Sequence, residues 1–238
     1  IVAHCSALLE PRLYMRGVSS VLKFANGNPR SLLYGAFYFT EALMIRRWMK
    51  ARRLDHLHVH FGGAAANVAL LLKQFADIRW SMTIHGPDEF YDVPGQKLRE
   101  KIALCDQIIC ISHFARSQLM QMSDPKHWPK IEVVRLGIDP KNYASPAQRP
   151  QTDVFRLFCV GRLTPAKGQR LLIEVAKRLK AAGRVLDLVI VGAGPDDRML
   201  RAAAVESGVA DMVTFVGPQT PSEVHKWYAE ADAFILPS

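Results

Sequence analysis

Two cations follow a short apolar run in the second half of the chain, at a spacing that suits a phosphate site. Arg162 comes directly after the run FRLFCVG at 155–161, and Lys167 precedes a segment with a helical pattern from about 167 to 182. In open α/β sheets ligands bind at the carboxyl ends of strands, and the N-terminus of the following helix adds free N–H groups and partial positive charge. We therefore expect Gly161, Arg162 and Lys167 to bind a diphosphate.

An arginine offers a planar fork of donors, and a lysine offers a point charge. Together they bind a diphosphate and stabilise the charge that grows on it while a glycosidic bond breaks. Such a site needs no metal ion. The alternative is that both side chains are solvated loop cations, as isolated surface cations usually are. The joint placement of Arg162 and Lys167 between a strand and a helix favours phosphate binding.

A histidine has the same kind of position in the first half of the chain. His85 ends the strand-like run WSMTIH at 80–85, and Gly86 permits a turn that brings the histidine close to a ligand. We expect His85 to act in catalysis, with Asp88 orienting it or binding a second substrate. A strand-end histidine with only structural contacts is the alternative.

Three other patterns resemble functional motifs. His56, His58 and His60 alternate on one strand face, yet no carboxylate or thiolate ligand is evident beside them, so we predict no metal site. The glycines of FGGAAANVALLL at 61–72 suit a tight turn or a close approach to an acceptor. The GxG of VGAGPDDRML has Asp197 where a dinucleotide fingerprint needs a third glycine, which argues against an NAD-dependent enzyme.

Short apolar runs alternate with helix-prone segments from about residue 55, which predicts parallel sheets built from βα units. Ser112 is the expected N-cap of one such helix, and the Pro-rich segment 139–153 indicates a domain boundary. We expect two doubly wound, Rossmann-like α/β domains at residues 1–142 and 154–238, joined by a linker at 143–153. The strand-like runs are 57–61, 80–85, 107–112 and 131–137, then 155–161, 186–192, 212–217 and 233–237.

Composition narrows the choice of partners. The 238 residues carry 31 Lys and Arg against 22 Asp and Glu, and the net charge of +9 favours nucleotide phosphates, nucleic acid or an anionic membrane. Aromatic residues lie in apolar runs such as 37–39 and do not alternate with cations as an RNA-stacking surface requires, so we expect no nucleic acid. Four scattered cysteines without a CxxC pair indicate a reducing, cytoplasmic environment.

The most apolar segment, 31–45, contains Glu41 and is shorter than the roughly 20 residues that a spanning helix needs. It runs into RRWMKARR at 46–53, where five cations surround Trp48 and Met49. This basic segment is either a helix that lies on the inner face of the cell membrane or a long helix with one buried and one solvated face. The sequence leaves both interpretations open.

Several strings, in one order along the chain, together resemble family 4 of the retaining glycosyltransferases over about residues 55–238. They are ISHFARSQL, VVRLGIDPKNY, FCVGRLTPAKGQRLLIEVAKRL, LVIVGAGPDDRML and VTFVGPQTPSEVHKWYAEADAFILPS. The resemblance implies a GT-B fold, in which two domains face a cleft. It also implies transfer of a sugar, with retention, from a nucleotide-sugar donor to a saccharide or lipid-diphosphate-linked saccharide acceptor, with no cofactor.

In that family the residues matching Arg162 and Lys167 contact the diphosphate, and SMTIHGPDEFYD resembles the loop in which His85 would face the transferred sugar. HWPKIEVVRLGID further resembles a subgroup of bacterial exopolysaccharide and colanic acid biosynthesis. The family's acidic pair would lie beyond Ser238, and its opening strand ahead of Ile1, so we expect a fragment with an incomplete second domain.

Two alternatives remain for the function. Nucleotide-sugar epimerases have the same architecture, but they need acid and base groups on both sides of the sugar. A basic binding module for membranes or nucleic acid would have kept the fold without the chemistry.

Overall fold

The computed structural model describes residues 2–86, 88–140 and 154–238, with Asp88 described in its backbone only. Contacts divide the chain into two compact units, residues 1–137 and 138–238. The predicted linker 143–153 lies outside the described residues.

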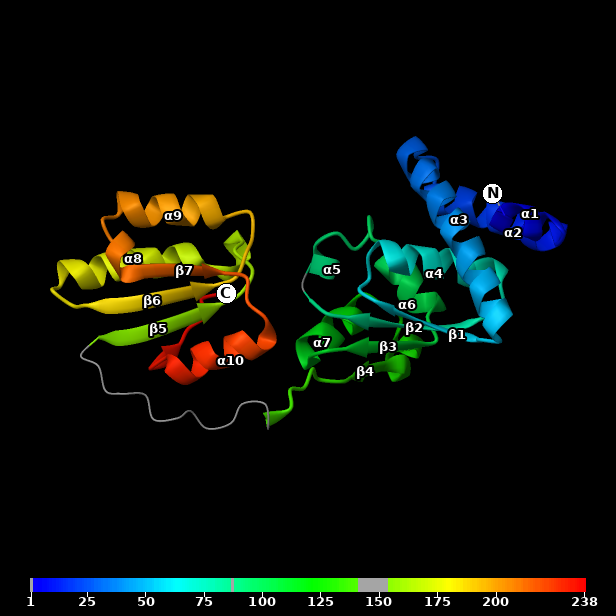
Figure 1. Ribbon diagram of the computed structural model, residues 1–238. Helices are drawn as coiled ribbons and strands as arrows, with labels where there is room; N and C mark the ends of the chain where they lie inside the picture. Colours follow the sequence, from blue (N-terminus) through cyan, green and yellow to red (C-terminus); the bar gives the residue numbers. More distant parts are fainter. Residues whose placement is uncertain (1, 87, 141–153) are drawn as a thin grey trace. The chain divides into compact units, whose positions relative to one another are not determined.

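A parallel sheet forms the centre of the first unit (Figure 1), as the alternating pattern predicted. Its strands lie side by side in chain order: β1 (His56–His60), β2 (Arg79–Ile84), β3 (Gln107–Cys110) and β4 (Ile131–Val133). The helices that follow them are α4 (Ala64–Phe75), α5 (Asp88–Tyr91), α6 (Leu98–Leu104), α7 (His113–Gln121) and the 3-10 helix η1 (Pro125–Lys130). Ser112 caps α7 by accepting a hydrogen bond from the Ala115 N–H at 3.1 Å, as expected. The predicted strand 131–137 was too long, because Val134 and Leu136 are exposed beyond the paired residues.

Three helices precede this sheet: α1 (Val2–Leu8), α2 (Pro11–Ala25) and α3 (Pro29–Arg52). The Asn28 side chain starts α3 by accepting hydrogen bonds from two backbone N–H groups. Helices α2 and α3 pack closely at Gly17, where a Cβ atom would lie 2.2 Å from the ring of Phe39. No helix in the described part of the chain is both long and apolar enough to cross a membrane.

The basic segment at the end of α3 combines buried and exposed residues. Arg46 and Lys50 both form ion pairs with Glu10, at 2.7 and 3.3 Å. Met49 is buried, whereas Trp48 is 55% exposed beside the solvent-facing Arg47. The segment therefore packs through one face and keeps a basic, aromatic face in solvent.

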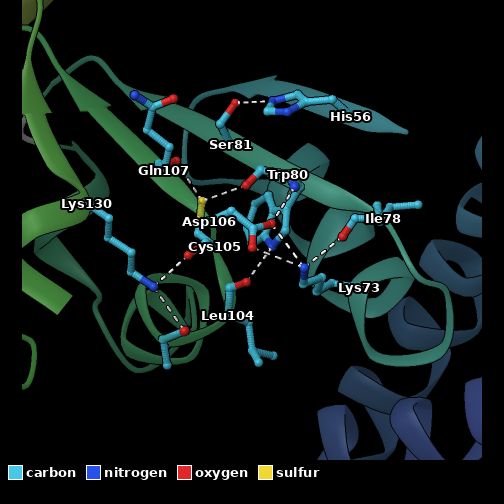
Figure 2. Close-up of polar contacts among 11 residues, drawn as sticks. His56, Lys73, Ile78, Trp80, Ser81, Leu104, Cys105, Asp106, Gln107 and Lys130 are labelled. Carbon is cyan, nitrogen blue, oxygen red and sulfur yellow. Dashed lines mark hydrogen bonds and ion pairs between the residues drawn. The ribbon is translucent and has the colours of Figure 1, made fainter. Parts of the chain in front are cut away.

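A polar network fixes the amino ends of β2 and β3, at the edge of the sheet opposite to His85 (Figure 2). The Asp106 carboxylate accepts a hydrogen bond from the Trp80 N–H at 2.8 Å and forms an ion pair with Lys73 at 3.0 Å. Burial raises the pKa of Asp106, but these two partners outweigh it, and the pKa lies below its ordinary value. The indole of the fully buried Trp80 donates to the Leu104 carbonyl, and burial raises the pKa of Cys105 to about 12. This network is structural, since its groups satisfy one another.

The second unit holds another parallel sheet, in the order β7-β6-β5-β8. Helices α8 and α9 cover one of its faces, and α10 covers the other, so the unit is doubly wound as predicted (Figure 1). The strands are β5 (Phe155–Val160), β6 (Leu186–Val191), β7 (Val213–Gly217) and β8 (Ala233–Phe234). The helices are η3 (Pro165–Lys167), α8 (Gln169–Ala181), α9 (Asp197–Glu206), η4 (Ala210–Met212) and α10 (Pro221–Glu230).

Buried apolar side chains form the core on each face of this sheet. Leu172, Ile173 and Ala176 of α8 pack with the β6 residues Leu188 and Ile190 on one face. Tyr228 of α10 contacts Phe158 edge to face on the other, with ring centroids 5.0 Å apart. A sheet covered on both faces explains why its strands read as continuous apolar runs.

Candidate functional site

The loop after β5 carries the predicted cations at the carboxyl end of the sheet. Lys167 ends the short helix η3, Gly168 has a φ of +68°, and α8 begins at Gln169. The predicted helix start near 167 was therefore two residues early, because the left-handed conformation at Gly168 separates the two helices. Arg162 is exposed, and Lys167 is half-buried with its Cδ 3.9 Å from where a Cβ on Gly161 would lie. The structure thus brings Gly161 and Lys167 together ahead of the N-terminus of α8.

Glycines of the neighbouring loop fix the backbone of Arg162. The Leu163 N–H donates to the Ala193 carbonyl at 3.0 Å. A Cβ atom on Gly192 would lie 1.9 Å from the Gly161 carbonyl oxygen, and one on Gly194 would lie 2.2 Å from that of Leu163. The two glycines of the GxG string therefore allow close contact between two loop backbones, which is a structural role that places Arg162.

Gln169 also belongs to this site, although the sequence analysis did not identify it. Its side chain is 1% exposed, and its Nε2 donates a hydrogen bond to the Arg162 carbonyl at 3.1 Å. The first residue of α8 therefore holds the loop that carries the candidate phosphate ligand. Its place directly after Gly168, where a helix starts, was the only signal of this role in the sequence.

His85 directly follows β2 and is held between two residues from the end of β1. Its Nε2 lies 2.9 Å from Nδ1 of His60, within hydrogen-bond distance. The Phe61 ring also contacts the His85 ring, with ring centroids 4.5 Å apart. Phe61 has a φ of +68°, although glycines follow it, so the turn uses a strained residue and not the glycines that we expected to provide it.

A buried carboxylate joins the loops that carry these side chains. Glu89 is 5% exposed, and its two oxygens accept hydrogen bonds from the Gly62 N–H at 2.8 Å and the Gly86 N–H at 2.9 Å. The sequence analysis assigned an orienting role to the neighbouring Asp88, whose side chain lies outside the described residues. The structure shows that the Glu89 carboxylate connects the loop that follows His60 and Phe61 to the loop that follows His85.

A buried lysine acts on the same glycine loop. Lys101 of α6 is fully buried, and its Nζ donates to the carbonyls of Gly62, at 2.5 Å, and Gly63, at 3.3 Å. Burial lowers the pKa of Lys101 to about 7, although the charges of Glu100 and Glu89 act in the opposite direction. The sequence does contain a signal for this burial. Lys101 lies one helical turn after Leu98, so both side chains are on the same, buried face of α6.

The other histidines of β1 bind hydroxyl groups of β2. His56 lies 2.8 Å and His58 lies 2.7 Å from the Ser81 Oγ, and burial together with the charges of His60 and His56 lowers the pKa of His58. Within the described ranges no three His, Cys, Asp or Glu side chains gather in an arrangement that could hold a metal ion. The alternating histidines thus have strand-to-strand contacts.

Comparison with known families decides the identity of the chain. The model described as Glycosyltransferase Family 4 matches residues 5–142, and the model described as Glycosyl transferases group 1 matches residues 142–238. The chain belongs to glycosyltransferase family 4. Solved glycosyltransferases share the fold of this family 4 chain, so its predicted α/β fold of the GT-B class is confirmed.

Curated relatives of this family 4 chain have names from polysaccharide assembly. The amylovoran biosynthesis glycosyltransferase AmsK of Erwinia amylovora is 30% identical over 190 residues, which are 77% of this chain and 46% of AmsK. The putative colanic acid biosynthesis glycosyltransferase WcaL of Escherichia coli K12 is 30% identical over 193 residues, 78% of this chain and 47% of WcaL. The family 4 chain therefore spans about half the length of these relatives.

A solved structure with bound ligands has the same fold. The pneumococcal O-GlcNAc transferase GtfA, determined in complex with UDP and GlcNAc, superposes with a TM-score of 0.59 at 17% identity. The match covers 82% of the family 4 chain and 40% of GtfA. At this identity the likeness concerns the fold.

The buried Lys101 leads to a prediction about pH. Its pKa is about 7 in the folded chain and 10.5 in the unfolded chain, so between these values the unfolded state binds more protons, and stability rises with pH. In Lys101→Met this contribution is absent. We expect the variant to lose stability relative to the wild type by at most about 1.4 kcal/mol per pH unit from pH 7 to 10.

Urea unfolding of the first unit, followed by the ¹³C-methyl signal of the buried Met82, measures this difference. Lys23→Met, which removes an exposed lysine of the same unit, is the control and should keep the wild-type pH dependence. If the free energy of unfolding differed between Lys101→Met and the wild type by the same amount from pH 7 to 10, this would contradict the lowered pKa of Lys101.

Proposed function

We propose that this chain contributes to a glycosyltransferase that moves a sugar, with retention, from a nucleotide-diphosphate sugar to a saccharide or lipid-linked saccharide acceptor. The observation that carries the proposal is the loop after β5, where Arg162 and Lys167 precede the N-terminus of α8. Gly168 caps that helix without a side chain, and the Leu171 N–H donates to its carbonyl at 2.9 Å, so the N–H groups of Gln169 and Arg170 are the ones offered to an anion. The exopolysaccharide names of AmsK and WcaL support this class of product.

The leaving group explains why cations serve this reaction. Negative charge grows on the diphosphate as the glycosidic bond breaks, and a preorganised guanidinium and ammonium stabilise it without a metal ion. No cofactor is required, because the nucleotide sugar itself is the activated substrate. GtfA, which has the same fold, was solved with UDP, and this supports a nucleotide donor.

His85 is our candidate for contact with the transferred sugar. Its ring is held by His60 and Phe61 at the carboxyl end of β2, which is where ligands bind in open α/β sheets. We propose that it forms a hydrogen bond that strengthens as the sugar acquires oxocarbenium character. Asp88 remains a proposed contact to His85 or the acceptor.

We further propose residues 1–142 as the acceptor-side domain and residues 154–238 as the nucleotide-sugar domain. The two family models meet at residue 142, and this supports the division. We place the enzyme on the cytoplasmic side of the membrane, where an anionic surface would attract the exposed face of α3. Trp48 and Arg47 on that face suit an interface with anionic lipid.

The first prediction from the proposed function concerns the two cations, Arg162 and Lys167. In the full-length enzyme, Arg162→Ala and Lys167→Ala should each lower kcat/KM by about 100-fold or more, because each removes a charge partner of the leaving diphosphate. Arg178→Ala removes an exposed arginine of the following helix α8, paired with Glu174, and should keep wild-type kinetics. Steady-state assays with EDTA present measure all three. Unchanged kinetics in both loop variants, or an absolute need for a divalent ion, would refute the assignment.

The second prediction separates binding from turnover. His85→Ala should lower kcat far more than it weakens donor binding, because its hydrogen bond acts on the transition state. Calorimetry with the nucleotide sugar and a turnover assay give the two quantities independently. A variant that no longer binds nucleotide but turns over bound donor normally would exclude this role.

The third prediction concerns the membrane. The chain should sediment with vesicles that contain anionic phosphatidylglycerol but not with vesicles of phosphatidylcholine alone, and Trp48→Ala with Arg47→Gln should reduce the bound fraction severalfold. Lys126→Gln, an exposed cation of the same unit, is the control. Equal binding to both vesicle types, or no binding, would leave α3 as a solvated helix.

A further inference from the structure

His60 and His85 come from the ends of adjacent strands. His60 is the last residue of β1 and pairs in register with Thr83 of β2, two residues before His85. Their rings meet at the carboxyl edge of the sheet, with centroids 5.1 Å apart and the His60 Nδ1 2.9 Å from the His85 Nε2. The contact thus joins a residue without an assigned role to the residue proposed to meet the transferred sugar.

The backbone that follows His60 keeps this contact in place. The Phe61 N–H donates to the Thr83 carbonyl at 2.8 Å, although its positive φ is costly for a residue with a Cβ atom. Glu89 and Lys101 then hold Gly62 from its N–H and its carbonyl. Strained residues persist where their surroundings over-determine them, and such positions cluster at functional sites.

The chemistry of imidazole makes the contact informative. A neutral ring has one donor and one acceptor nitrogen, so a hydrogen bond between the His60 Nδ1 and the His85 Nε2 links the tautomer of each ring to that of the other. If the His60 Nδ1 accepts, the His85 Nδ1 carries a lone pair; if it donates, the His85 Nδ1 carries a proton. In either case Nδ1 is the ring nitrogen of His85 that remains for a ligand.

We propose that His60 is a positioning residue that fixes the ring orientation and the single tautomer of His85, so that only Nδ1 is offered to the substrate. The inference rests on the proposed role of His85 in sugar transfer. His60 acts through His85 and does not itself contact the reacting atoms. The contact with the Phe61 ring restricts the same imidazole further.

Ring ¹⁵N spectra of the histidine-labelled chain test the tautomer without any activity. Measured at about pH 8.5, above the ordinary titration range of histidine, wild-type His85 should show one tautomer. His60→Leu should give a mixture of both. His60→Asn should restore a single form, since its amide group lies about where Nδ1 was. His56→Asn changes a histidine on the same strand that contacts Ser81, and should leave His85 unchanged.

Kinetics of the full-length enzyme supply the second readout. We expect His60→Leu to lower kcat about 10-fold with little change in KM, and His60→Asn to recover most of the loss. An unchanged His85 spectrum in His60→Leu, or a mixed tautomer in the wild type, would overturn the inference. A tautomer effect in an enzyme that transfers no sugar would instead retain the contact and refute the proposed function. Amide spectra of the first unit establish that each variant is folded.

Discussion

The buried carboxylate of Glu89 is the interaction on which the geometry of the first unit depends. A carboxylate that leaves water must find donors, and Glu89 finds them in the backbone N–H groups of Gly62 and Gly86. These glycines belong to different strand-end loops, so satisfying one side chain fixes the distance between the loops. Lys101 binds the carbonyl of the same Gly62. Through these two loops, the Glu89 carboxylate therefore sets the relative positions of the His60, Phe61 and His85 side chains.

In the second unit, the loops at the strand ends are held together mainly by contacts between their backbones. Gly192 and Gly194 let one strand-end loop lie against the backbone of the next, and Gln169 binds the Arg162 carbonyl from the start of α8. In both units, hydrogen bonds and close backbone contacts within the loops thus hold the candidate functional residues in place. Preorganisation of this kind is what electrostatic stabilisation of a transition state requires, because charges that are already in place need not reorganise during the reaction.

The sequence could predict the features that depend on local pattern. Alternating apolar runs located the strands and predicted that they pair in parallel, and the positions after those runs located Arg162 and His85 at strand ends. It could not predict contacts between residues far apart in the chain. Nothing near Glu89 in the sequence shows that its oxygens reach Gly62, and the sequence analysis named only the neighbouring Asp88. The strain at Phe61 was missed because adjacent glycines offered a simpler turn, and the start of α8 was misplaced because Gly168 adopts a left-handed conformation.

The central claim is that the loop from Gly161 to Gln169 binds the diphosphate of a nucleotide sugar. A titration of the ¹⁵N-labelled chain with UDP, GDP and ADP, in the presence of EDTA, tests it most directly. We predict that at least one nucleotide shifts the backbone amide signals of residues 161–169 saturably, and that the matching nucleoside without phosphates does not. Amide signals in this loop that stay unchanged with all three nucleotides, while signals elsewhere respond, would contradict the account.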